Sequence, residues 1–359
     1  MSTSKIQQHV VENQEVFVGL EDSKRTWVVC ARSGGMIVQE TSMPAIYDGL
    51  KNYLGNSFPG CRIKIVYEAG FRGFGLHDRL VEDGFECTVT PPHTVTEEKC
   101  SRQKNDRVDS RRLAKNLENR DCGRCHVPDK QLREDRQLSR LYEQVQRDIT
   151  RESNRIRRAI DFHGLDGHFK AGKWTRRDYQ AAKKVLERLE LSHSMRVTFE
   201  MYYSIIETLW EKKKELIKEL KTIAQDDRYK KQVRILKSVP GIGIMTAIRL
   251  LLEWGDVSRF TRKEEFVNFL GLAPREQSSG DRERRGHITR QGCRWVRAWL
   301  VESAWVALRH DPALLAKFNR ISSHSGRKKI AIVAVARTLA TRCRAILMSG
   351  EEYTIGLVA

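Results

Sequence analysis

Four acidic residues of this 359-residue chain stand where carboxylates can act together on metal ions. Glu21 ends a β-rich segment, and Glu68 ends an apolar run. Asp106 and Asp109 open a helical segment, and their spacing of three residues puts them on one helical face. Hard oxygen ligands suit Mg²⁺, and a pair of such ions stabilises the attacking and leaving oxygens of a phosphodiester. The set therefore predicts a magnesium site for phosphodiester chemistry, although each acid taken singly is more often a surface charge or, as for Asp106, a helix cap.

A serine in an arginine-rich stretch offers a second kind of chemistry. Ser279 is followed by Gly280 and preceded by Ser278. A serine hydroxyl that is activated by a metal or a base attacks a scissile phosphate, and arginines stabilise the developing charge. The alternative, which chemistry alone favours, is a turn whose arginines grip phosphate without reacting. The arginines expected to bind nucleic acid here are Arg282, Arg284, Arg285, Arg290 and Arg294.

The segment Pro240-Gly241-Ile242-Gly243 has the form of a helix-hairpin-helix. Pro240 ends one helix, and the two glycines allow a tight turn. The amides at the start of the next helix are then free to meet a phosphate. We therefore count Gly241 and Gly243 as candidate nucleic-acid contacts; the alternative is a tight helix–helix turn with no ligand.

The charge of the chain points to a polyanionic partner. Lys and Arg number 65 against 46 Asp and Glu, which gives +19 and a pI near 9.7. Nucleic acid is the commonest such partner, and basic residues spread along the whole chain do not suit a membrane-binding helix. We expect a cytoplasmic protein with reduced cysteines, since no signal peptide or membrane span is evident. The Cys122-Gly-Arg-Cys125-His126 segment lacks a second cysteine pair at zinc spacing and is expected to be a surface loop.

The first third of the chain reads as an α/β domain over residues 14–125. β-rich and apolar runs predict strands, and segments between them predict helices. Three antiparallel strands followed by helix, strand, helix and strand is the order expected of an RNase H-like domain. The predicted segments are strands 15–20, 26–31 and 36–40, helix 44–56, strand 63–67, helix 73–83 and strand 87–90.

The rest of the chain is predicted to be mainly helical. Apolar residues at helical spacing between Leu138 and Ile160, and again between Leu209 and Ile223, predict two long helices. They indicate a helical or coiled-coil arm over residues 126–228, either a spacer or an arm for dimerisation or nucleic-acid clamping.

From Leu236 onward we expect short helices joined by glycine-containing loops, closed by an apolar helix from Lys328 to Ser349. These make a C-terminal domain over residues 229–350. Three tryptophans, Trp254, Trp295 and Trp299, sit among apolar residues at helical spacing and are expected to be core residues.

The ordered motifs together resemble a known family. They are Gly19-Leu20-Glu21 with Lys24, Tyr67-Glu68-Ala69, Lys104-Asn105-Asp106-Arg107-Val108-Asp109, Arg111-Arg112-Leu113-Ala114, Val127-Pro128-Asp129, the glycine hairpin, and the block from Gly271 to Arg297. With them, the chain resembles the DEDD transposases, recombinases of a bacterial insertion-sequence family that use a bridge RNA to choose target and donor DNA.

The resemblance implies a RuvC-like domain that binds Mg²⁺ through Glu21, Glu68, Asp106 and Asp109. It implies that Ser279 attacks DNA and holds a strand end covalently. The acids and the serine would meet across protomers of a homo-oligomer, a dimer to a tetramer. Target DNA, donor DNA and an element-encoded bridge RNA would be the partners, at the nucleoid of a bacterial cytoplasm. The remaining residues expected at nucleic acid are Lys24, Arg107 and Arg111.

One position departs from the family pattern. The first acid is usually Asp in a Gly-x-Asp setting, whereas Gly19-Leu20 leads here to Glu21, with Asp22 next. Spacing favours Glu21, because strand alternation aims Asp22 at the opposite face. Ser278 competes with Ser279 as nucleophile. Two other functions stay open: a junction-resolvase-like nuclease that uses water, and a catalytically weakened nucleic-acid-binding protein derived from a transposase.

Overall fold

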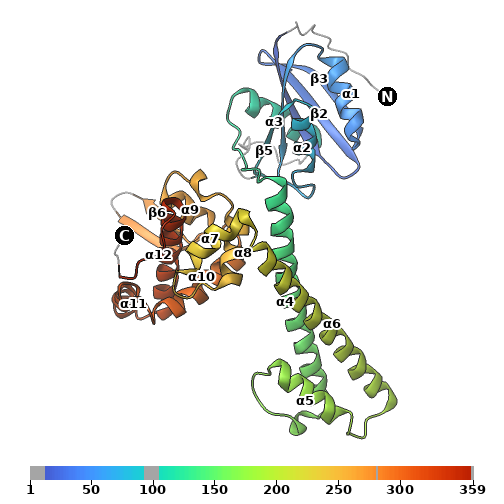
Figure 1. The fold of residues 1–359 in the computed structure, drawn as a ribbon. Helices are drawn as coiled ribbons and strands as arrows, with labels where there is room; N and C mark the ends of the chain where they lie inside the picture. The colour runs from blue at the N-terminus through green and yellow to red at the C-terminus, as the bar shows by residue number, and fades with distance from the viewer. Residues whose placement is uncertain (1–12, 93–104, 280–281, 357–359) are drawn as a thin grey trace. The chain divides into compact units, whose positions relative to one another are not determined.

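The computed structural model describes residues 13–92, 105–279 and 282–356 (Figure 1). The chain divides into two compact units, Met1–Pro128 and Asp129–Ala359. The first is a mixed α/β domain and the second is mostly helical, as the sequence predicted. Among the described helices, none is both long and apolar enough to cross a membrane.

A five-stranded sheet forms the centre of the first unit, in the order β3-β2-β1-β4-β5. The first three strands are antiparallel, and β1, β4 and β5 run parallel. This arrangement agrees with the RNase H-like plan. The elements are β1 (Glu15–Asp22), β2 (Thr26–Ser33), β3 (Met36–Pro44), α1 (Tyr47–Ser57), β4 (Arg62–Glu68), α2 (Gly75–Glu82), β5 (Glu86–Thr90) and α3 (Asp106–Glu118).

The two faces of the sheet are covered by different helices (Figure 1). On one face, Val18 and Leu20 of β1 are fully buried in a cluster that includes Leu50 and Leu54 of α1. On the other face lies α3. A side chain on Gly19 would place its Cβ 2.1 Å from the backbone oxygen of Ser110. The glycine therefore allows α3 to lie directly on β1, because successive residues of a strand point to opposite faces.

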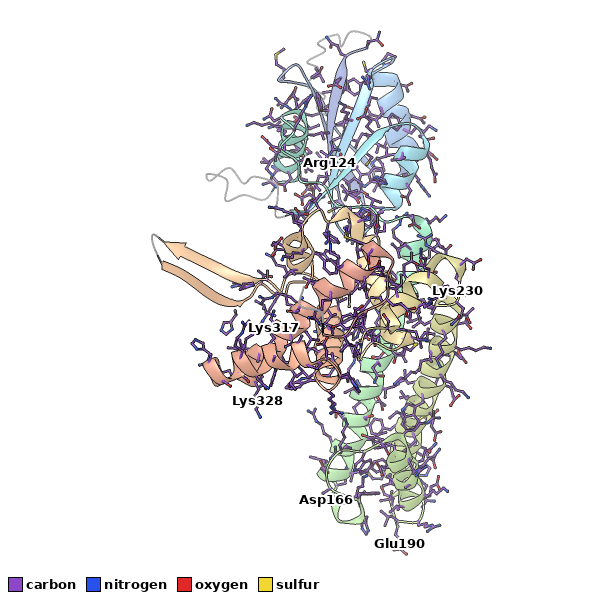
Figure 2. The ribbon with its side chains drawn as sticks, turned by 60° about the vertical axis from the view of Figure 1, so that its left-hand side comes forward. Arg124, Asp166, Glu190, Lys230, Lys317 and Lys328 are labelled. Atoms are coloured by element: carbon purple, nitrogen blue, oxygen red, sulfur yellow. The ribbon has the colours of Figure 1, made fainter. Side chains whose placement is uncertain are left out.

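The second unit begins with two long helices that pack along each other, α4 (Lys130–Phe162) and α6 (His193–Ile223). Ile156 and Ile206 are fully buried in the apolar cluster that the two helices share. The short helix α5 (Arg176–Leu186) lies near the end of the pair where α4 finishes and α6 starts. Asp166 and Glu190 lie at this end (Figure 2). Two long helices were predicted, and the supercoiling of the pair stays a prediction.

The remaining helices gather around one apolar core in which Trp254 and Phe266 are fully buried. Trp254 was predicted to be a core residue, and this is confirmed. Trp299 is half-buried and packs against this core, and Trp295 is half-buried. The helices are α7 (Asp227–Lys237), α8 (Ile244–Trp254), α9 (Lys263–Phe269), α10 (Arg294–Ala307), α11 (Pro312–Ser325) and α12 (Lys328–Ser349).

A two-stranded antiparallel ribbon, β6 (Pro274–Ser279) and β7 (Arg282–Ile288), interrupts this helical region. It projects from the helical body (Figure 2). The expectation of only helices and loops here was wrong. The strands read PREQSS and RERRGHI and have no alternation of apolar and polar residues, so the pattern that marks a half-buried strand is missing.

Candidate functional site

Glu21 and Glu68 stand side by side at the carboxyl edge of the sheet. β1 and β4 are parallel neighbours, with Leu20 opposite Tyr67, and the next residue of each strand is one of these acids. Gly19 and Val66 face α3. Because side chains alternate along a strand, both glutamates also point to the α3 face.

The first turn of α3 brings the two aspartates to the same edge. Asn105 caps the helix, since its side-chain oxygen accepts a hydrogen bond of 3.1 Å from the Arg107 amide. The capping role considered for Asp106 therefore belongs to its neighbour. Asp106 is exposed. Asp109 is 9% exposed and directly precedes Ser110, the residue that lies over Gly19.

Arg112 joins two of the acids. Its Nη2 lies 2.8 Å from Oδ1 of Asp109 and 3.9 Å from Oε1 of Glu68. A cation within this distance offsets the repulsion between carboxylates. In the part of the chain that the structure describes, no three acids, histidines or cysteines are arranged as a ready metal site. The backbone thus brings the acids to one edge, and the side chains of Glu68 and Asp109 engage an arginine.

Asp22 belongs to the opposite face of the sheet, as strand alternation predicts. It accepts a hydrogen bond of 2.7 Å from Trp27 Nε1, and Nε of Arg72 lies 2.6 Å from it. Burial raises the pKa of Asp22, against the opposing effects of Trp27 and Arg72. Asp22 is therefore held in a local polar cluster at the same end of β1 as Glu21, on the opposite face of the sheet.

The basic residues predicted near the acids differ in their partners. Arg111 forms a bidentate ion pair with Glu40 of β3, with 2.7 Å between Nη2 and Oε2. This hydrogen bond lowers the pKa of Glu40. Lys24 and Arg107 are exposed. Arg111 thus anchors α3 to the sheet, while Lys24 and Arg107 face solvent near the acid edge.

Ser279 is the last residue of β6, at the outer end of the ribbon, and its Cα lies opposite that of Arg282. Ser278 pairs with Glu283, and Arg284 and Arg285 lie further along β7. The structure describes only the backbone of residues 276–279 and 282–285, and Gly280 lies outside the described residues. The choice between Ser278 and Ser279 stays a prediction.

The backbone at the base of the ribbon is closely packed. Gly271 and Gly292 have φ of +66° and +82°, and side chains there would put Cβ 1.7 Å from the Gln291 oxygen and 2.1 Å from the Phe269 oxygen. Nη1 of Arg297 donates to the backbone oxygens of Leu270, Gln291 and Gly292 at 3.2, 3.0 and 3.0 Å. Close backbone packing and one guanidinium therefore fix where the ribbon leaves the helices.

The remaining predicted arginines flank this base. Arg290 is exposed and has φ of +58°, and Arg294 is exposed at the first residue of α10. Sequence reasoning did not single out Arg112 or Arg297 as structural residues. The signal for Arg112 was its spacing of three from Asp109, which puts the two on one helical face. For Arg297 the signal was weaker, because it is one of two basic residues in the first turn of an apolar helix.

The two glycines of the predicted helix-hairpin-helix have different constraints. Gly241 has φ of +85°, and a Cβ there would lie 2.4 Å from the backbone oxygen of Ser303 in α10. Packing against α10 therefore requires glycine at this position. Gly243 is the N-cap of α8, and nothing lies within 4 Å of the position its Cβ would take. The start of α8 is open at Gly243, and nucleic-acid binding there stays a prediction.

Comparison with known proteins gives the family. A family model described as a transposase of the DEDD IS110 type matches residues 18–164, and one described as the transposase IS116/IS110/IS902 family matches residues 233–319. The two matches together cover more than half of the chain. The chain belongs to the IS110/IS116 family of transposases.

Individual relatives agree with this assignment. The putative transposase y4qE of Sinorhizobium fredii is 24% identical over 96% of this transposase and 92% of its own length. The transposase of insertion sequence element IS1111A from Coxiella burnetii is 25% identical, over 67% of this chain and 62% of its own. The transposase of insertion sequence element IS1533 from Leptospira borgpetersenii is 26% identical, over 54% and 56%.

Proposed function

We propose that this transposase is an RNA-guided DNA recombinase that cuts and exchanges strands through a covalent serine–DNA intermediate, with Mg²⁺ bound by its acids. The observation that carries the proposal is the position of the acids. Glu21 and Glu68 share one face at the end of two parallel strands, and Asp109 shares Arg112 with Glu68. Acids on adjacent strand ends and a crossing helix suit metal-assisted phosphodiester chemistry.

The donor set fits a hard divalent cation. Glu21, Glu68, Asp106 and Asp109 would hold it, because carboxylate oxygens are the ligands that Mg²⁺ prefers. When bound, the cation would polarise the scissile phosphate and stabilise the leaving oxygen. The glutamate at position 21 is one methylene longer than the usual aspartate, and we propose that it serves in the same role.

The chain supplies the nucleophile through Ser279. Its hydroxyl oxygen forms a bond to the scissile phosphorus, and the bond from phosphorus to one sugar oxygen breaks. The serine proton passes to the released sugar oxygen, which leaves as a hydroxyl, so one phosphodiester is exchanged for another without water. The arginines predicted around the ribbon, Arg282, Arg284, Arg285, Arg290 and Arg294, would hold the phosphate and its developing charge.

The partners follow from charge and from the family resemblance. A net charge of +19 suits simultaneous binding of target DNA, donor DNA and an element-encoded RNA. Lys24 and Arg107, both exposed near the acids, and the open start of α8 at Gly243 are the proposed backbone contacts. We further propose that the working form is a homo-oligomer.

The test is a gel assay for a protein–DNA adduct that survives denaturation. Full-length protein is mixed with RNA from the flanks of its element, target DNA and Mg²⁺. Glu21→Gln and Ser279→Ala are compared with the parent, and Glu68→Gln and Ser278→Ala are run beside them. We expect an adduct that needs Mg²⁺, that Ser279→Ala abolishes because alanine has no oxygen to bond to phosphorus, and that Glu21→Gln reduces by about a thousandfold, a loss of several kcal/mol of transition-state stabilisation.

Other outcomes select the competing functions. Cleavage without an adduct, with free phosphate ends, would indicate a junction-resolvase-like nuclease. Binding of RNA and DNA with steep salt dependence but no cleavage at any Mg²⁺ concentration would indicate a binding protein derived from a transposase. An adduct that Ser279→Ala still forms and Ser278→Ala does not would identify Ser278 as the nucleophile.

A further inference from the structure

Phe71 is an exposed aromatic residue in a turn close to the acid edge. Its exposed fraction is 67%, and it lies three residues after Glu68. The Gly73 amide donates to the Gly70 oxygen over 3.2 Å, so Phe71 is the second residue of a four-residue turn. Single exposed apolar side chains are common on protein surfaces, so what distinguishes Phe71 is how the turn that carries it is held.

The turn is clamped from two sides. The hydroxyl of Tyr67, a fully buried residue, donates to the Gly73 oxygen over 3.1 Å. Arg72 donates to the backbone oxygens of Ser23 and Lys24 over 3.1 and 3.0 Å and forms an ion pair with Asp22. The turn after β4 is thereby tied to the turn after β1, which begins after Asp22, the residue next to Glu21.

Arg72 also supports the ring itself. Its guanidinium carbon lies 5.3 Å from the centre of the Phe71 ring and 5.4 Å from the centre of the Trp27 ring. Trp27 is buried, with 2% of its surface exposed. A cation over each ring is attracted to its negative face. Phe71 is therefore held from beneath by an arginine that the sheet fixes, and most of the ring surface remains open to solvent.

We propose that Phe71 is a stacking platform for an unpaired base of the DNA strand beside the cleaved phosphodiester. The inference rests on the proposed function, because it takes the acid edge as the place of cleavage. A rigid exposed ring loses little entropy on binding, and base–aromatic stacking accepts every base. Such a contact holds a strand near the acids without reading its sequence, which suits a protein that leaves sequence choice to base pairing.

The test uses the full-length protein with its RNA and a target DNA that carries 2-aminopurine at one position near the cleavage site. Each position is tried in turn, in EDTA, so that binding is measured without cleavage. Stacking quenches 2-aminopurine fluorescence. We expect quenching at one position, which Phe71→Ala removes while weakening DNA binding about tenfold, and which Phe71→Trp restores. Phe162→Ala is the matched control, because Phe162 is 85% exposed and lies on the helical pair.

Several results would overturn the inference. Quenching that Phe71→Ala leaves unchanged would do so, as would failure of Phe71→Trp to restore it. Quenching by Phe71 of 2-aminopurine placed in the RNA, and of none in the DNA, would overturn the assignment to DNA. Failure of the proposed function is read separately, as the absence of cleavage when Mg²⁺ is supplied to the parent protein. Circular dichroism of each variant establishes that it is folded.

Discussion

The acid edge and the serine ribbon position their residues in opposite ways. Glu21 is the second-last residue of β1 and Glu68 the last of β4, and both follow fully buried residues, Leu20 and Tyr67. Asp109 lies on a helix that packs against the same sheet. Ser279 is the last residue of β6, the first strand of a polar two-stranded ribbon whose base Arg297 ties to the helices. A two-stranded hairpin is marginally stable by itself. The acids are thus positioned by a core, and the serine by an anchored extension.

The difference indicates that the acids need fixed positions relative to one another, whereas the position of the serine can vary. Carboxylates that share a cation must keep their mutual spacing, and a packed core holds spacing because it deforms little. A nucleophile that carried a DNA strand, as proposed for Ser279, would gain from an element that can change its position. The comparison predicts that substitutions at the acid edge lower the free energy of unfolding of the first unit. Substitutions at the ribbon base are predicted to act mainly on the local order of the ribbon.

The largest effect is expected from Gly19→Ala. The new methyl group would lie 2.1 Å from the Ser110 oxygen, so α3 must move away from β1. The free energy of unfolding of the first unit should fall by about 3 kcal/mol, as measured by urea unfolding. Gly55→Ala is the control, because its Cβ has open space in α1 and should raise stability by about 0.5 kcal/mol. Equal stability of Gly19→Ala and Gly55→Ala would contradict the conclusion that a packed core positions the acids.

Arg297→Gln should loosen the ribbon. It removes the guanidinium that binds three backbone oxygens at the ribbon base. We expect stability to fall by about 2 kcal/mol, and amide exchange of residues 274–288 to rise by more than that of α12. Arg309→Gln, at an exposed position, is the control. Exchange that rises evenly through the second unit would mean that ribbon and body are one cooperative element.

Asp311→Asn should weaken the helical body beneath the ribbon instead. Asp311 is 1% exposed, caps α11 and pairs with Arg342 at 2.8 Å. Burial acts to raise the pKa of Asp311, but hydrogen bonds from Tyr353 and the α11 amides, with the charge of Arg342, leave it lowered. We expect a loss of about 1.5 kcal/mol at pH 7, measured by urea unfolding.

The pH dependence of that loss has a defined sign. A lowered folded pKa means that the carboxylate stabilises the fold above the unfolded pKa, near 4, and that this contribution is lost as pH falls through the folded value. The stabilities of the parent and Asp311→Asn should therefore approach each other below about pH 4. A constant difference across this range would contradict the role assigned to the charge.

The smallest effect on stability is expected from Gly243→Ala. Nothing lies near its Cβ position, so the cost should be about 0.5 kcal/mol, from the poorer helix cap. Gly241→Ala should cost more, about 2 kcal/mol, because of its positive φ and its contact with Ser303. If α8 meets a phosphate, Gly243→Ala should still weaken DNA binding in a filter-binding titration.

The sequence predicted the first unit well because its signals are local. Apolar runs ended at polar residues, so the strands, their order and the position of Glu21 and Glu68 at strand ends could be read directly. The contact of Arg112 with both Glu68 and Asp109 could not, because it depends on how closely α3 approaches β1. Gly19 sets that distance because it has no side chain, and the hydrophobic periodicity of the sequence does not reveal such a close approach.

The second unit was predicted less completely. The ribbon was missed because its strands are polar on both faces, and the start of α6 at His193 lies well before Leu209, where the expected helix begins. The stretch from Val197 to Ile206 is rich in β-branched and aromatic residues, which weakens a helical signal that packing against α4 overrides. The division into 14–125, 126–228 and 229–350, and the roles of the site residues, stay predictions.

Arg112 also affects the stability of the protein when no metal ion is bound. Carboxylates held close together repel one another, and this repulsion weakens a fold unless a cation lies between them. Here a covalently attached counter-ion already touches two of the acids. The folded fraction should therefore be insensitive to the free magnesium of the cell, so that a newly synthesised chain can be stored intact and wait for its nucleic acid.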